Sequence, residues 1–251
     1  MALFRRLSAL LATLLFAATA GLAAAKPLSL DEVIAKARAA LAADASELSK
    51  VRSLRLRFAA SDEKGRPLNV TTLTLAAGGY RLQNTADRDR GFEAAVCSGR
   101  LEGWTTTKPD ALSARSVRPL PYEEFKKLRD MALDDLAFFA VPPAGLGSAT
   151  YRGMAEIDGR RTHAVEYAYA SGFRITRQFD AETFVLVASD QTTPKGELQR
   201  QKVEAMTKTG GIAFPAKESI FVDGRKSGEG NYDEIVINPA LTPGLFDFPS
   251  F

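Results

Sequence analysis

From residue 53 onward, apolar and polar side chains alternate along most of the chain, which is the period of a half-buried β-strand. In the first such run, the apolar face carries Leu54, Leu56 and Phe58. Runs of this kind, separated by turn residues, predict about ten antiparallel strands in a meander. In the second half of the chain, Asp158-Gly159 is a strong signal for a two-residue hairpin turn.

Two segments have the spacing of an amphipathic helix instead. Residues 29–43 form the first, because Ser29 can cap it and Glu32 completes a capping box. Residues 122–139, which lie between proline-rich stretches, form the second. The apolar stripe of this second helix consists of Phe125, Leu128, Ala132, Leu136 and Phe139.

An antiparallel sheet of about ten strands does not remain flat, because right-handed twist makes it coil. We therefore expect an α+β, mainly β fold: a strongly curved antiparallel sheet, or half-barrel, with two or three helices covering its concave face. Such a fold can enclose an apolar cavity. The side chains expected to line the cavity and its lid are Leu54, Leu56, Phe58, Leu73, Leu75, Trp104, Phe125, Leu128, Leu136, Phe139, Phe173, Ile175 and Phe179. The helix at 122–139 is the expected lid.

The first 25 residues have the layout of a secretory signal peptide. Arg5 and Arg6 precede an apolar stretch at 7–22, and the small residues at 23–25 offer a cleavage site near Ala25. An uncleaved membrane anchor is the less favoured interpretation, since the apolar run is short for a spanning helix. We expect residues 26–251 to form a single exported domain. No cysteine follows the cleavage region, so lipidation of the new N-terminus is not expected.

Charge and composition exclude several kinds of partner and chemistry. Of the 33 Lys and Arg residues, two belong to the signal peptide, and the other 31 face 30 Asp and Glu residues. A chain so balanced lacks the basic surface that nucleic acid requires. Cys97 is the only cysteine, so an intramolecular disulfide is impossible, and its apolar surroundings favour a buried, inert thiol. The sequence leaves open the alternative of a disulfide between Cys97 and another chain.

Candidate catalytic chemistry is sparse. His163 is the only histidine, and its place in a strand favours a structural or surface role over catalysis. Asp130, Asp134 and Asp135 form a small acidic group on the second helix, for which a solvated helix face is a better interpretation than a cation site. We expect no enzyme activity, no metal and no cofactor.

The order of elements resembles that of the LolA/LolB-type lipoprotein-sorting proteins of the bacterial periplasm. The segments that carry the resemblance are FRITRQFD at 173–180 with Thr183 and Leu186-Val187 after it, GGIAFP at 210–215, INPAL at 237–241 and LFDFP at 245–249. The resemblance extends over residues 29–251 and is strongest after Tyr151. It is a pattern of apolar and turn residues, so it bears on the fold more than on the function.

The resemblance implies a periplasmic carrier that shields the acyl chains of a lipid or lipoprotein in its concave cavity. The partners would then be acyl chains and the sorting proteins of the inner and outer membranes. The absence of a lipidated cysteine disfavours the family's outer-membrane receptor form. Candidates for the family's cavity-gating arginine are Arg55, Arg57 and Arg81.

Two alternatives remain open at this stage. The same fold with a filled core would serve as a protein-interaction or stress-sensing module in the envelope. A hydrolase that uses His163 or a carboxylate pair is the least favoured of the three.

Overall fold

The computed structural model describes residues 28–193 and 195–249, and the predicted signal peptide with its cleavage site near Ala25 lies outside these residues. Three helices are present: α1 (Leu30–Leu41), α2 (Ala45–Ser49) and α3 (Tyr122–Ala137). The strands are β1 (Ser53–Asp62), β2 (Pro67–Ala76), β3 (Tyr80–Asp87), β4 (Phe92–Ser98), β5 (Gly103–Lys108), β6 (Ser116–Pro119), β7 (Gly147–Ile157), β8 (Arg160–Tyr169), β9 (Arg174–Asp180), β10 (Leu186–Thr192), β11 (Leu198–Thr209), β12 (Ile212–Val222) and β13 (Arg225–Ile237). No helix in the described part of the chain is long and apolar enough to cross a membrane.

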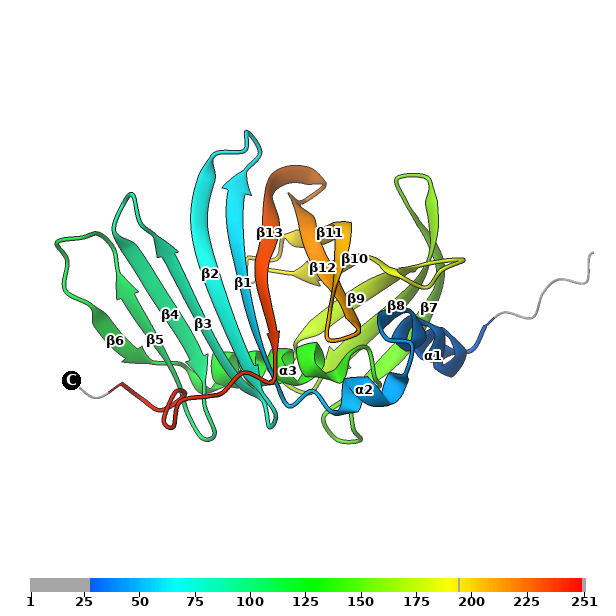
Figure 1. Cartoon of the computed structure of the whole chain (residues 1–251), viewed down its shortest axis with the longest axis horizontal. Helices are drawn as coiled ribbons and strands as arrows, with labels where there is room; N and C mark the ends of the chain where they lie inside the picture. The colour runs from blue at the N-terminus through cyan, green and yellow to red at the C-terminus, as the bar shows by residue number, and fades with distance from the viewer. Residues whose placement is uncertain (1–27, 194, 250–251) are drawn as a thin grey trace, which may run out of the picture.

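All 13 of these strands belong to one antiparallel sheet, in the order β6-β5-β4-β3-β2-β1-β13-β12-β11-β10-β9-β8-β7. The sheet curves strongly but does not close, which confirms the predicted half-barrel (Figure 1). Its two halves are meanders, and they join where β1 pairs with β13. The sequence pattern missed β6, a four-residue edge strand that ends in a proline, which only an edge position tolerates.

Helix α3 connects the two free edges of the sheet, because it follows β6 and precedes β7. Figure 1 shows it crossing one end of the half-barrel, with α1 and α2 at the same end. Helix α1 begins at the predicted capping box: Ser29 Oγ accepts from the Glu32 amide, and the Glu32 carboxylate accepts from the Ser29 amide at 2.7 Å. The main apolar core lies on the concave face, between these helices and the sheet.

Two of the three acidic residues of α3 are buried, so the predicted solvated face is wrong for Asp130 and Asp134. Asp134 is 2% exposed. It accepts hydrogen bonds from both terminal nitrogens of Arg177 on β9 and from the Tyr169 hydroxyl, the latter at 2.9 Å. Asp130 is 1% exposed and accepts from the Ser171 amide at 3.3 Å. Helical spacing placed these carboxylates on one face, but it did not reveal that this face packs on the sheet.

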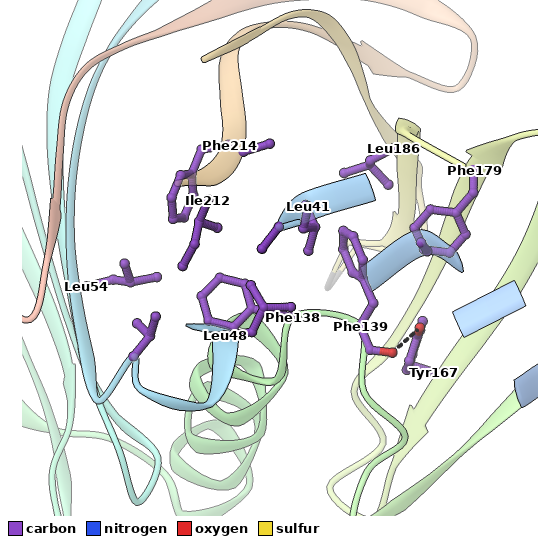
Figure 2. Packing of buried hydrophobic residues seen from close by; sticks show 14 of the residues in the cluster. Leu41, Leu48, Leu54, Phe138, Phe139, Tyr167, Phe179, Leu186, Ile212 and Phe214 are labelled. Atoms are coloured by element: carbon purple, nitrogen blue, oxygen red, sulfur yellow. Dashed lines mark hydrogen bonds between the residues drawn. The ribbon is translucent and has the colours of Figure 1, made fainter. Parts of the chain in front are cut away.

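Helix α3 ends in two phenylalanines with left-handed backbone conformation. Phe138 and Phe139 have φ values of 48° and 67°, a strained region for residues with a side chain. Arg38 on α1 holds the turn by donating to the carbonyls of Ala137 and Phe138 at 2.7 Å each. Tyr167 donates to the Phe139 carbonyl at 2.9 Å (Figure 2). The turn therefore sets both phenyl rings among the core side chains.

A second apolar cluster covers the convex face. Leu82, Cys97 and Trp104 are direct cross-strand neighbours on β3, β4 and β5. The C-terminal segment lies over them, and the Phe246 carbonyl accepts from Trp104 Nε1 at 3.4 Å. Burial of Cys97, together with the negative charge of Asp247, raises the pKa of its thiol to about 12. The predicted burial of the thiol is confirmed.

We predict that removing either partner of the Asp134–Arg177 pair destabilises the protein by about 3–5 kcal/mol, because the remaining charge is left buried and unpaired. The variants are Asp134→Asn and Arg177→Met, and urea unfolding measures the effect. Arg57→Met is the matched control: it breaks the half-exposed pair with Asp233, which contributes at most about 1 kcal/mol. An Asp134→Asn effect as small as that of the control would contradict the structural role assigned to this pair.

The Cys97 thiol should resist Ellman's reagent in the folded protein at neutral pH, because burial and the raised pKa leave almost no accessible thiolate. One equivalent should react after unfolding in urea, which serves as the control. Rapid labelling of the native protein would show that the C-terminal segment does not cover this face.

Candidate functional site

The concave side of the half-barrel encloses a cavity of about 490 Å³ between the sheet and the ends of α1 and α3. Most of its wall is apolar, and Figure 2 shows several of these side chains converging around Phe138 and Phe139. The apolar wall includes Leu41, Leu54, Leu56, Phe58, Leu73, Leu75, Phe138, Phe139, Phe173, Ile175, Leu186, Phe214 and Ile235. The period of two in the strands produces this wall, since alternate residues of one strand face the same side.

The structure brings together most of the residues that the sequence places in the cavity. Those on its wall are Leu54, Leu56, Phe58, Leu73, Leu75, Phe139, Phe173 and Ile175. Phe179 is fully buried behind the wall and packs edge-on against Phe139, with ring centroids 4.9 Å apart. Leu136 packs against the same core.

The other three predicted residues lie away from the cavity. Trp104 belongs to the cluster on the convex face, which corrects its predicted position. The alternation along β5 did not show which of its two faces points inward. Phe125 is buried and Leu128 is half-buried, both in the part of α3 that precedes the cavity wall.

Several wall residues were missed by the sequence analysis. Phe138 is one of them. The predicted helix includes this residue, whereas α3 ends at Ala137 and Phe138 belongs to the turn that follows. Leu186 and Phe214 come from β10 and β12, where the same alternation that identified Ile175 could have found them.

Part of the wall is polar and charged. Side chains of Ser189, Gln191, Gln199 and Gln201 from β10 and β11 line it and are half-buried. The charged groups come from α3 and from the strands opposite, and comprise Arg81, Asp134, Asp135, Arg177 and Glu218. The cavity is therefore amphipathic, with a large apolar region and a smaller polar one.

Of the three arginines considered as a gate, Arg81 alone lines the cavity. It is 7% exposed and donates to Asp135 at 3.2 Å and to Gln83 at 3.0 Å. Burial lowers its pKa, and the charge of Asp135 opposes that effect. Its Nε atom is enclosed and has no hydrogen-bond partner in the described structure.

Arg55 and Arg57 project from the other face of β1. Each pairs there with a carboxylate of β13, Arg55 with Glu234 at 2.7 Å and Arg57 with Asp233. Both ion pairs are partly exposed and lie on the convex side. Neither arginine can reach the cavity from there.

Glu218 on β12 is the second carboxylate of the polar wall. It is 8% exposed and accepts a hydrogen bond from the Tyr232 hydroxyl at 2.9 Å. Burial raises the pKa of Glu218, and repulsion from Asp135 raises it further, whereas the Tyr232 hydrogen bond lowers it. Loss of surrounding water inside the cavity likewise raises the pKa of Asp135, although its side chain is partly exposed, and the neighbouring Arg81 partly offsets this effect.

The remaining candidates for chemistry lie outside this cavity. His163 is 6% exposed, its Nδ1 lies 2.8 Å from the Tyr151 hydroxyl, and its ring stacks on Phe184. Burial lowers the pKa of this histidine. Cys97 lies on the opposite face of the other half of the sheet. Within residues 28–193 and 195–249, no group of three or more His, Cys, Asp or Glu side chains is arranged to hold a metal ion.

Comparison of the fold with solved structures identifies similar proteins. A DUF1329 family protein from Desulfovibrio piger superposes with a TM-score of 0.54 and 14% identity, over 86% of this chain and 96% of that one. A LolA superfamily protein from Nitrosomonas europaea superposes with a TM-score of 0.54 and 12% identity, over 87% of this chain and 97% of that one. No protein-family model matches the sequence, and no curated protein matches it. The chain therefore has the fold of a LolA-superfamily protein, as the sequence resemblance predicted.

Proposed function

We propose that this protein is a non-enzymatic periplasmic carrier that binds the acyl chains of a lipid or lipoprotein in its concave cavity. The observation that carries the proposal is the apolar cavity itself. Its volume of about 490 Å³ falls in the range of about 300–1,000 Å³ that is usual for small-molecule sites. The signal peptide predicted for residues 1–25 and the LolA-type fold support the same assignment.

Hydrophobic transfer supplies the affinity of such a site. Each methylene group that leaves water for an apolar wall contributes about 0.8 kcal/mol, so a long chain binds firmly without a specific polar contact. The leucines and Phe58 of β1 and β2 provide that wall on one half of the sheet, and Phe173 and Ile175, at the start of β9, provide it on the other. In this proposal the single domain at 26–251 delivers its cargo during outer-membrane lipoprotein sorting, with membrane proteins on either side as partners.

The lid in this proposal is the end of α3. The helix leads into Phe138 and Phe139, which line the cavity wall and have left-handed backbone conformation. The buried Asp134–Arg177 pair ties the helix to β9, so the body of α3 is a fixed support. Opening is therefore assigned to the turn at 138–139 rather than to the whole helix.

The mature protein, purified without detergent, should carry about one acylated molecule per chain. Native mass spectrometry followed by lipid extraction measures this occupancy and identifies the ligand. A ligand-free mass, combined with no uptake of either a fluorescent fatty acid or a neutral hydrophobic dye, would contradict the carrier proposal. That result would favour the interaction or sensing module with the same fold.

Neighbouring residues of β9 offer a matched test of the site. Ile175 lines the cavity, whereas Thr176 faces the other side of the sheet. Ile175→Asn should weaken binding of a neutral hydrophobic dye about tenfold or more, because a polar group in an apolar wall costs about 1–3 kcal/mol. Thr176→Asn should leave the affinity unchanged. Equal effects of the two substitutions, measured by fluorescence titration, would place the binding site elsewhere.

A further inference from the structure

Glu218 is a buried carboxylate that faces the cavity without a cationic partner. Only 8% of the residue is exposed, and it belongs to the cavity wall. Its one hydrogen bond within the described residues comes from the Tyr232 hydroxyl to Oε2, which leaves Oε1 without a donor. Burial of a carboxylate with so little compensation is costly, and proteins tolerate it where a bound group supplies the missing charge or donor.

Asp135 presents a second carboxylate to the same cavity from α3. Its side chain is 39% exposed although it lines the cavity wall, so it is accessible to a molecule inside. Arg81 contacts only its Oδ2 atom. Both residues line the same cavity, and the charge of Asp135 contributes to the raised pKa of Glu218. Two negative groups from different elements thus face one space.

The arginines of the wall do not balance this charge. Both terminal nitrogens of Arg177 are engaged by Asp134. Those of Arg81 are engaged by Asp135 and Gln83, and its Nε is enclosed by protein atoms. The wall therefore has two arginines for three carboxyl groups, and Glu218 is the one that has no arginine as a partner.

From this arrangement we infer that the ligand is an aminolipid, a long acyl or alkyl chain that carries an ammonium group. The inference rests on the proposed function and specifies its ligand class. The ammonium group binds at Glu218, on the cavity wall that Glu218 shares with Asp135, and one of its three N–H donors satisfies Glu218 Oε1. The chain lies along the apolar wall that begins at Phe58 and Ile235, next to Tyr232. A free fatty acid would bring a further carboxyl group to Glu218 and could not supply the missing cation.

Displacement of a bound neutral dye tests this inference with three competitors of equal chain length: dodecylammonium, dodecanol and dodecanoate. The mature wild-type protein should bind dodecylammonium at least tenfold more tightly than dodecanoate at neutral pH, with dodecanol between them. Glu218→Gln keeps the shape of the side chain and an acceptor for Tyr232 but removes the charge. In this variant the preference should fall to about threefold or less. Asp135→Asn should reduce the preference in the same direction.

Glu234→Gln is the matched control, because this carboxylate is partly exposed on the convex face and pairs with Arg55. It should leave the preference for dodecylammonium intact, which excludes a general effect of net charge. A dodecanoate affinity equal to that of dodecylammonium, or a preference that survives both Glu218→Gln and Asp135→Asn in folded protein, would overturn the inference while the proposed function stands. Failure of all three competitors to displace the dye would overturn both.

Discussion

The pair between Asp134 and Arg177 is the interaction on which the rest of this structure depends. It is buried on both sides and joins α3, which connects the two edges of the sheet, to β9 in the far half of the half-barrel. Arg177 also lies over the rings of Phe139 and Tyr167, at 5.2 and 5.0 Å from their centroids. Burial alone would lower the pKa of Arg177, but the charge of Asp134 holds it above its usual value. Arg177 therefore stays protonated, and its contact with Asp134 fixes the helix across the concave face.

The position of α3 in turn shapes the cavity. Once the helix is fixed, its end must turn back toward β7, and the left-handed turn at Phe138 and Phe139 directs two aromatic rings into the concave space. The neighbouring Asp135 then faces the cavity, opposite Glu218 on β12. The two aromatic rings in the cavity wall and the position of Asp135 thus both follow from one anchoring contact.

The local features of this fold were predictable from sequence because they depend on neighbouring residues. Ser29 and Glu32 form the predicted capping box, and Asp158-Gly159 forms the predicted hairpin turn, with φ values of 50° and 78°. Alternation identified Leu54 and Leu56 as one face of β1 because the period of a strand is fixed.

Long-range features were not predictable in this way. Alternation along β5 cannot tell whether Trp104 points to the concave or the convex side, since that depends on how the C-terminal segment folds back over the sheet. The burial of Asp134 depends on Arg177, which is 43 residues away in the chain and on another element. The candidate site needed both kinds of information, because its apolar wall follows the strand period whereas its charged groups meet only in three dimensions.

The most direct test of a ligand-binding cavity is a crystal structure of the mature protein purified without removal of bound lipid. We predict continuous elongated electron density between Leu56, Phe138 and Ile175, with one end at Glu218. A cavity filled by rearranged side chains, or one that contains only separate water molecules beside Glu218 and Asp135, would contradict it.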